Sequence, residues 1–427
     1  MSPLRAFATG MGARQRQSHL PPITGPKLQV QAARAPLPAY PFQPLPPPNG
    51  PAPFRYDLSN LLTADDINKI TDAGVIVFHS VGDTGDFRGE QMDFVSAMMT
   101  HDSNTLADDR KPAFYYHLGD VVYFAGDIIG YPDNFYQTYK DYPAFIVSIA
   151  GNHDCQPDDP ADGPGDPNKT PLDGWVQNFM AKDPTEPGSR EILTGRTRMD
   201  LPNVYWTFTT PFATIIGLFS NVGESQGEIH QDQIDWFRGE LTAADPKKAL
   251  IVTVHHPPFS GDSEHSGSSA VDKVLAASFL ATGRYPNLVL SGHVHNYQRF
   301  TNVVAGPKGQ LQIPYIVAGA GGYKNLGKLQ KINGAYPDPT KPLAVGARLT
   351  LERYDHDDFG FLRLEVSKTQ IVGTYLSAPY TVGASQPVGS MVESFTIDLA
   401  KNTVTTNGGG GGKKPTPPKP PKKKKKS

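Results

Sequence analysis

Residues 75–85 read VIVFHSVGDTG, an apolar run followed at once by a glycine and an aspartate. Two more apolar runs, Phe114–Leu118 and Phe145–Ala150, also end at a glycine and a polar residue. Helical patterns over 89–99 and 134–140 separate the three runs. This alternation predicts βαβ units and a largely parallel sheet in the first half of the chain. In such sheets ligands bind beyond the carboxyl ends of the strands, which is where these polar residues fall.

The second half of the chain is predicted to be richer in strands. Helices are expected over 231–241 and 270–281. Strands are expected over 204–209, 213–219, 250–254, 288–290, 313–318, 348–351, 361–366 and 370–375. The last of these alternate apolar and polar residues, as half-buried antiparallel strands do. Residues 156–200 are rich in Pro, Asp, Gly and Lys, which predicts a long loop or insertion.

Composition divides the 427 residues into a folded body and two unusual ends. Residues 1–55 contain thirteen prolines and no Asp or Glu, which predicts a disordered or extended segment. Residues 56–405 hold the apolar runs and are expected to form the folded domain. Residues 406–427 contain five consecutive glycines at 408–412, followed by lysines and prolines, which predicts a linker and a disordered tail.

The eight lysines between Lys413 and Lys426 mask an acidic body, because the formal net charge of the whole chain is −2. We expect this tail to be solvated, since it has no aromatic residues for stacking on bases. A weak electrostatic contact with an anionic surface or with nucleic acid is the alternative.

Cysteine usage and the apolar runs bear on the compartment. Cys155 is the one cysteine, so the chain can form neither an internal disulfide nor a thiolate metal cluster. The first residues lack an apolar segment of signal-peptide type, and no run reaches the length of a membrane span. These features predict a cytoplasmic protein.

Five short motifs offer oxygen and nitrogen ligands. In chain order they are Gly82-Asp83-Thr84-Gly85, Gly119-Asp120-Val121-Val122-Tyr123, Gly151-Asn152-His153-Asp154, His255-His256-Pro257 and Gly292-His293-Val294-His295. One Gly-Asp pair is commonly a turn, but the full set matches what two metal ions need from distant parts of a chain. His293 and His295 flank one residue, so extended backbone would point both imidazoles to the same side.

As a set, the five motifs resemble those of the calcineurin-like metallophosphoesterase superfamily over about residues 75–375. The resemblance implies a four-layer α/β/β/α sandwich of two mixed sheets, with helices outside and a metal site at the carboxyl edge of the strands. Many members carry a histidine where this chain has Gly85, and Tyr123 follows Asp120 by three residues. That pairing resembles purple acid phosphatases, and residues 119–126 resemble their small single-domain type.

The resemblance also implies a role for each matching residue. The first metal would be bound by Asp83, Tyr123 and His295, the second by Asn152, His255 and His293, and both by a bridging Asp120. The implied ions are Fe(III) with Fe(II), Zn or Mn. A hydroxide held by them would attack phosphorus. His153 and His265 would contact the phosphate, and one of them would protonate the leaving group.

The expected function is therefore hydrolysis of small phosphomonoesters, with a nucleotide or other phosphodiesterase as the alternative. Ser225 lies in a Gly-x-Ser-x-Gly pattern that could serve a serine hydrolase, with Asp262 and either His293 or His295 as partners. That reading leaves the other motifs unexplained. A metal-binding scaffold that presents its basic tail to an anionic partner is the non-enzyme alternative, and it would need neither of the two phosphate-contacting histidines. In the fourth motif, the family pattern favours a supporting or packing role for His256, with contact to the metal or the substrate as the alternative.

Overall fold

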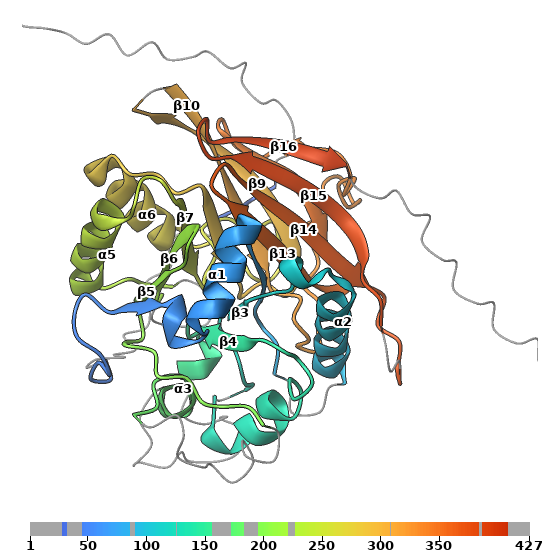
Figure 1. The fold of residues 1–427 in the computed structure, drawn as a ribbon. Helices are drawn as coiled ribbons and strands as arrows, with labels where there is room; N and C mark the ends of the chain where they lie inside the picture. The colour runs from blue at the N-terminus through green and yellow to red at the C-terminus, as the bar shows by residue number, and fades with distance from the viewer. Residues whose placement is uncertain are drawn as a thin grey trace, which may run out of the picture.

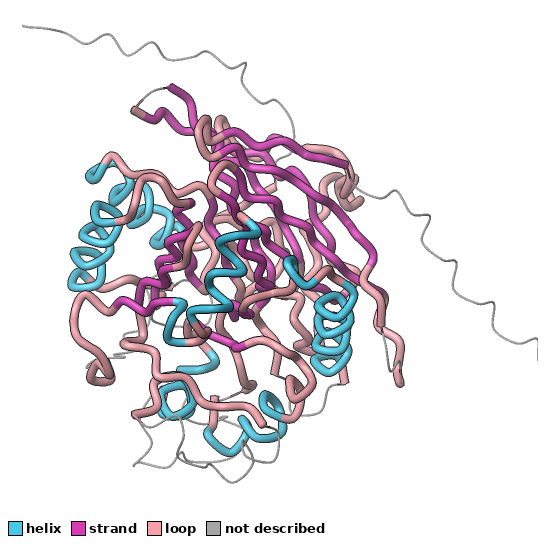
Figure 2. Tube along the Cα trace, in the orientation of Figure 1, coloured by secondary structure: helices cyan, strands magenta, loops and turns pink. Residues whose placement is uncertain are grey.

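The computed structural model describes residues 28–31, 45–85, 90–124, 126–155, 172–182, 195–220, 227–307, 309–383 and 387–408. Two mixed β-sheets pack face to face, and helices cover their outer faces (Figure 1). This confirms the four-layer α/β/β/α arrangement of two mixed sheets with helices outside. Figure 2 shows the strands gathered between the helices. None of the described helices combines the length and the apolar character that a membrane span requires.

The first sheet has seven strands in the order β16-β15-β14-β13-β2-β3-β4. Their bounds are β2 Val75–Val81, β3 Phe114–His117, β4 Phe145–Ser148, β13 Phe359–Ser367, β14 Gln370–Ala378, β15 Ser390–Asp398 and β16 Thr403–Gly408. Strands β2, β3 and β4 are parallel, as predicted, and the other four form an antiparallel meander. Every residue of β2 is buried, which suits a central strand covered on both faces.

The second sheet has nine strands in the order β1-β5-β6-β7-β8-β10-β9-β12-β11. Their bounds are β1 Arg55–Asp57, β5 Trp206–Thr209, β6 Ala213–Leu218, β7 Ala249–Val254, β8 Leu288–Ser291, β9 Tyr297–Gly306, β10 Gly309–Ala318, β11 Leu343–Ala344 and β12 Leu349–Asp355. Strands β6, β7, β8 and β10 are parallel neighbours. The carboxyl ends of β7 and β8 therefore meet at one edge.

Aromatic rings fill the space between the two sheets. Phe78 and Phe114 of the first sheet stack with ring centroids 4.7 Å apart, and Phe114 lies 4.9 Å from Phe208 of the second. Tyr116 stacks on Trp206 at 5.8 Å. All five rings are buried, and burying each contributes about 1.5–3 kcal/mol. This packing fixes the position of one sheet relative to the other, and with it the positions of their strand ends.

The helices lie on both outer flanks. Their bounds are α1 Ala64–Ala73, α2 Gln91–Thr105, α3 Asp173–Phe179, α5 Gln231–Ala243 and α6 Ser269–Thr282, with 3₁₀ turns at Leu58–Asn60, Asp108–Arg110, Ile128–Gly130 and His153–Cys155 and a π-helical turn at Pro132–Tyr136. Helices α1 and α2 contact the seven-stranded sheet, and α5 contacts the nine-stranded one. Figure 1 shows α5 and α6 on one flank and α2 on the opposite flank.

Several elements differ from the sequence predictions. The helical pattern at 134–140 is a π-helical turn followed by ordinary turns. Helix α3 lies inside the stretch predicted as a loop, because Trp175 and Phe179 bury one side of a short helix that local composition does not reveal. Helix α1 and the strands β9, β15 and β16 were not expected at all.

The chain ends fall partly within the described residues. Leu28 is buried, and the Gln31 side chain donates a hydrogen bond to the Asp272 carboxylate at 3.0 Å. Residues 28–31 are thus extended against the folded body. The predicted domain boundaries stay predictions, with β1 beginning at Arg55 and β16 reaching Gly408. The lysine-rich tail lies outside the described residues.

Candidate metal centre

The seven predicted ligands meet where the carboxyl ends of the two sheets adjoin. Asp83 follows β2, Asp120 and Tyr123 follow β3, Asn152 follows β4, His255 follows β7, and His293 and His295 follow β8. All seven side chains are buried or nearly so. Five separate strand ends from two sheets therefore contribute to one polar cluster in an otherwise apolar interior.

One group in the cluster is centred on the Tyr123 hydroxyl. This oxygen lies 2.9 Å from Asp120 Oδ2, 3.2 Å from Asp83 Oδ1 and 3.2 Å from His295 Nε2. His295 Nε2 is itself 3.7 Å from Asp83 Oδ1. The three side chains expected to share the first metal are thus mutual neighbours, and Asp120 joins them.

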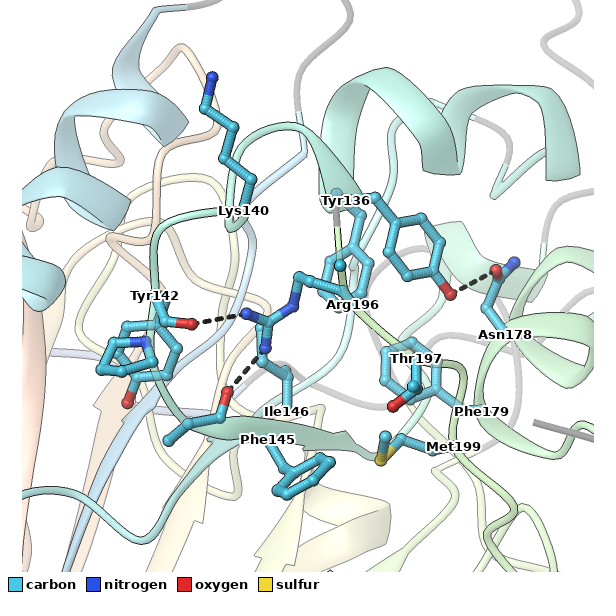
Figure 3. A pocket seen from close by; sticks show the side chains of 14 residues that line it. Tyr136, Lys140, Tyr142, Phe145, Ile146, Asn178, Phe179, Arg196, Thr197 and Met199 are labelled. Atoms are coloured by element: carbon cyan, nitrogen blue, oxygen red, sulfur yellow. Dashed lines mark hydrogen bonds between the residues drawn. The ribbon is translucent and has the colours of Figure 1, made fainter. Parts of the chain in front are cut away.

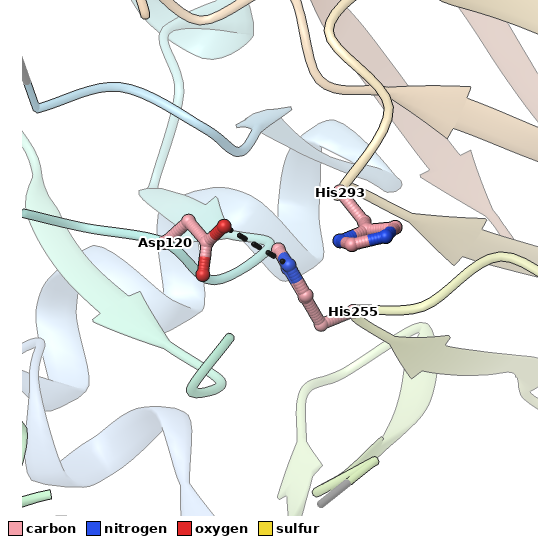
Figure 4. Close-up of side chains that lie close together, drawn as sticks. All are labelled: Asp120, His255 and His293. Atoms are coloured by element: carbon pink, nitrogen blue, oxygen red, sulfur yellow. Dashed lines mark ion pairs between the residues drawn. The ribbon is translucent and has the colours of Figure 1, made fainter. Parts of the chain in front are cut away.

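The second group is centred on the side-chain oxygen of Asn152. It lies 3.1 Å from His255 Nε2 and 2.9 Å from His293 Nδ1. Asp120 Oδ2 is 3.3 Å from His255 Nε2, so Asp120 touches this group as well (Figure 4). Asp120, His255 and His293 each bring a ligand atom within 4.8 Å of the others.

Hydrogen bonds behind two of the imidazoles set their tautomers. His255 Nδ1 lies 2.8 Å from the Leu118 carbonyl oxygen, and His295 Nδ1 lies 3.2 Å from the Asn325 carbonyl oxygen. A carbonyl only accepts, so each Nδ1 carries the hydrogen and each Nε2 turns a lone pair towards the cluster. Backbone carbonyls orient metal-binding histidines in this way.

The atoms around His255 Nε2 are all hydrogen-bond acceptors, so a proton or a metal ion must lie between them. Its lone pair faces the oxygen of Asn152 and a carboxylate oxygen of Asp120, so three acceptors meet without a hydrogen between them. Burial lowers the pKa of His255, but Asp120 and Asp83 outweigh burial and raise that pKa to about 9. Either a proton or a metal ion satisfies this arrangement, and the donor set suits a metal.

Burial and the same charges also shift the pKa values of the neighbouring carboxylates and of the Tyr123 phenol. Burial raises the pKa of Asp83 well above its ordinary value. Burial also opposes ionisation of Asp120, but His255 and His153 reverse the effect and lower its pKa. Burial, Asp120 and Asp83 raise the pKa of Tyr123. A strongly polarising cation is therefore required if this phenol is to bind as a tyrosinate.

Backbone geometry singles out the same positions. Asp83, Asp120 and His293 have φ values of 60°, 54° and 67°, in the left-handed region that side chains other than glycine rarely adopt. Such conformations cost on the order of 1–3 kcal/mol each and concentrate at functional sites. A larger residue would not fit at the preceding position, Gly292, because its Cβ would lie 2.7 Å from Asp83 Oδ2. A side chain at Gly151 would overlap the Asp120 carboxylate.

The two predicted phosphate-contacting histidines lie beside the cluster. His153 Nδ1 is 2.8 Å from the Phe124 carbonyl oxygen, which leaves Nε2 free to face a ligand. The ring of His265 lies 5.2 Å from that of His293 and 5.6 Å from that of His295. Its side chain is 32% exposed, so it reaches both solvent and the site.

His256 lies beside the cluster, and its supporting role stays a prediction. Its Nδ1 is 2.8 Å from the Ser220 hydroxyl, and its ring lies 4.4 Å from that of His293. Asp154 supports the strand ends in a different way. Its carboxylate accepts backbone N–H bonds from Asp120 at 2.8 Å and Gly151 at 2.8 Å, so it ties two motifs together.

Sequence reasoning missed an aromatic wall at the site. The Tyr323 ring lies 4.1 Å from that of Tyr123 and 4.6 Å from that of His295. Phe124 lies 5.8 Å from Tyr323 and is partly exposed. The position of Tyr323 directly after the glycine-rich stretch 318–322 was the available signal.

The serine-hydrolase alternative gains no support from the described residues. Ser225 lies outside them. Asp262, its proposed partner, instead accepts backbone N–H bonds from Glu264 at 2.8 Å and His265 at 2.9 Å. It therefore shapes the loop that carries His265.

A separate pocket of about 280 Å³ lies at the amino end of β4, away from the strand ends that carry the ligands (Figure 3). One of its polar residues is Arg196, whose guanidinium donates to the carbonyl oxygens of Tyr139 at 2.9 Å, Tyr142 at 2.7 Å and Ala144 at 2.7 Å. These hydrogen bonds from Arg196 stabilise the turn before β4. None of the predicted site residues lines this pocket.

A family model described as calcineurin-like phosphoesterase matches residues 77–297, a span that contains all seven predicted ligands. Purple acid phosphatase 21 of Arabidopsis thaliana is 32% identical over 139 residues, which is 31% of this chain and 30% of that protein. A probable cyclic nucleotide phosphodiesterase of Rhodococcus erythropolis is 26% identical over 181 residues, which is 41% of this chain and 51% of that protein.

The chain matches only 30% to 38% of the length of the curated purple acid phosphatases that it resembles. Among solved structures, that of PhoD aligns with 79% of this chain and 72% of its own, with a TM-score of 0.50 and 12% identity. At that identity the likeness concerns the fold alone.

Proposed function

We propose that this chain, which belongs to the calcineurin-like phosphoesterase family, hydrolyses phosphomonoesters with two bound metal ions. The division of the seven predicted ligands into two groups that share Asp120 carries the proposal. One group contains a phenol, and the other contains an amide and two imidazoles. The matches to purple acid phosphatases favour monoesters as the substrate class.

The donor atoms suit two different ions. Asp83, Tyr123 and His295 would hold Fe(III), because a phenolate and a carboxylate are hard donors. Asn152, His255 and His293 would hold Fe(II), Zn or Mn, and Asp120 would contact both ions. When bound, such ions polarise a phosphate ester and increase the acidity of the water that they hold.

The flanking histidines would handle the ester itself. His153 keeps its Nδ1 hydrogen on the Phe124 carbonyl and can turn Nε2 towards a phosphate oxygen. His265 adjoins His293 and His295 and remains open to solvent, so it can take up a proton and deliver it to the leaving oxygen. The buried rings of Tyr123 and Tyr323, which pack together beside His153 and His295, limit the access of bulk water on that side.

A substrate panel with metal analysis tests this proposal. We expect two metal ions per chain in the purified protein and a higher kcat/KM for phosphomonoesters than for phosphodiesters. The match to a probable cyclic nucleotide phosphodiesterase makes diester hydrolysis the second candidate, and a reversed preference would establish it. A protein that binds metal but hydrolyses neither class would be the scaffold of the non-enzyme alternative.

Replacing Tyr123 with phenylalanine tests the identity of the first ion. A tyrosinate bound to Fe(III) gives a visible charge-transfer band, so the iron-loaded protein should be coloured and Tyr123→Phe should lose the band. The matched control is Tyr323→Phe, which keeps the contact between the two rings and should keep the colour. Absorption spectra of the iron-loaded proteins check this. Colour that survives in Tyr123→Phe would show that this phenol is not a ligand.

A further inference from the structure

The rim of the metal centre carries a lysine that the proposed reaction does not use. Lys324 stands between two residues whose backbones bind the site. The Tyr323 N–H donates to the Asp83 carbonyl at 3.0 Å, and the Asn325 carbonyl oxygen lies 3.2 Å from His295 Nδ1. The backbone position of Lys324 is therefore set by contacts with two predicted ligands.

Two aromatic rings place the Lys324 ammonium. Its Nζ lies 4.9 Å from the ring centroid of Phe124 and 5.8 Å from that of Tyr323, both within cation–π distance. The Phe124 ring lies 6.1 Å from that of His153, and the Tyr323 ring lies 4.6 Å from that of His295. Each of the two rings thus lies near both the ammonium and a predicted site histidine.

The charge of this ammonium has no carboxylate partner among the residues that the structure describes. Lys328, in the same segment, pairs with Asp357 at 3.0 Å. Lys324 instead projects from an exposed position over the Phe124 ring, which is itself 37% exposed. A cation held in place by rings, without a counter-charge, can bind an incoming anion with little loss of side-chain freedom.

We infer that Lys324 binds a second anionic group of the substrate, carried on the same molecule as the phosphate ester. The inference rests on the proposed function, because it takes the metal centre as the place of the scissile phosphate. The two anionic groups would be separated by about the width of an aromatic ring, and the exposed face of Phe124 would pack against the part between them. A carboxylated aryl phosphate has this shape.

Binding of two non-hydrolysable analogues tests the inference. Calorimetry on the metal-loaded protein would compare phenylphosphonate with 4-carboxyphenylphosphonate, which differ by the para carboxylate. Wild type should bind the carboxylated analogue roughly three- to tenfold more tightly, the range expected for a partly exposed charge pair. Lys324→Met keeps the length of the side chain and removes the charge, so it should bind the two analogues equally. Lys324→Arg should keep the preference.

Lys331→Met is the matched control. The Lys331 Nζ also lies over a ring, 5.1 Å from the centroid of Tyr336, and that ring contacts His356 rather than a predicted site residue. This variant should bind both analogues as wild type does. The preference should also weaken as ionic strength rises.

Equal affinities in wild type, or a preference that survives in Lys324→Met, would overturn the inference. Hydrolysis of phenyl phosphate and 4-carboxyphenyl phosphate is measured separately. A wild-type protein that hydrolyses neither ester, yet shows a preference that depends on Lys324, would reject the proposed function and still support the anion contact.

Discussion

Replacing Asp120 with asparagine should remove most of the bound metal and lower turnover by roughly 10²–10³-fold. The Asp120 carboxylate is the group that both halves of the cluster share, with Oδ2 at 2.9 Å from the Tyr123 hydroxyl and 3.3 Å from His255 Nε2. Asparagine keeps the shape but offers one neutral oxygen in place of two charged ones. Metal polarisation is worth several kcal/mol, and 1.36 kcal/mol corresponds to a factor of ten. Elemental analysis and steady-state kinetics measure the two effects.

Two further variants make the Asp120 result specific. Asp109→Asn removes an exposed carboxylate on the 3₁₀ turn Asp108–Arg110, outside the five motifs, and should retain full metal content and turnover. Ser225→Ala should also be close to wild type. Near-normal turnover and metal content in Asp120→Asn, together with inactivity of Ser225→Ala, would reassign the chain to the serine hydrolases. Circular dichroism would confirm that each variant is folded.

Replacing His265 with alanine should lower turnover by roughly ten- to ten-thousand-fold on esters of poor leaving groups, the usual span for the loss of a general acid. Metal content should stay unchanged, because the predicted ligands do not include His265. Its place beside the cluster is held by the Asp262 carboxylate, which accepts the His265 backbone N–H at 2.9 Å. Kinetics with an alkyl phosphate and metal analysis check the two expectations.

Dependence on the leaving group separates proton donation from binding. A nitrophenolate leaves without a proton, so 4-nitrophenyl phosphate should recover much of the lost turnover in His265→Ala if the imidazole is an acid. An equal loss on alkyl and nitrophenyl esters would leave His265 only a binding role. His101→Ala, on α2, is the control and should behave as wild type with both esters. Unchanged turnover of His265→Ala on every ester would remove this residue from the site.

The pattern of apolar and polar residues within short segments was sufficient to predict the elements whose buried side chains recur at a regular spacing. The buried strand at 75–81 and the parallel arrangement of β2, β3 and β4 follow from apolar runs separated by helices, and the structure confirms both. It failed for α3, a short helix stabilised by the burial of Trp175 and Phe179 within a polar, proline-rich stretch. It also failed at 134–140, where the structure has the end of a π-helical turn followed by ordinary turns.

The motifs identified the chemical types at the site and the strand ends that carry them. The structure brings all seven predicted side chains together, while their role as metal ligands stays a prediction. Left-handed backbone at Asp83, Asp120 and His293 could not be read from the chain, because each conformation is imposed by the contacts that surround it. The carbonyls of Leu118 and Asn325 that orient two imidazoles likewise have no signature in the side-chain sequence.

The order of the ligands along the chain, the first parallel strands and the Tyr123–Asp120 spacing are properties of short segments. Apolar periodicity was enough to find the strands, and the motifs with their family resemblance were enough to find the ligands. The meeting of β7 and β8 with the ends of β2, β3 and β4 is a contact between two sheets, set by aromatic packing such as that of Phe114 on Phe208. The placement of Lys324 over Phe124 joins residues two hundred positions apart. Such long-range contacts depend on how complementary surfaces pack, which no local window of sequence contains.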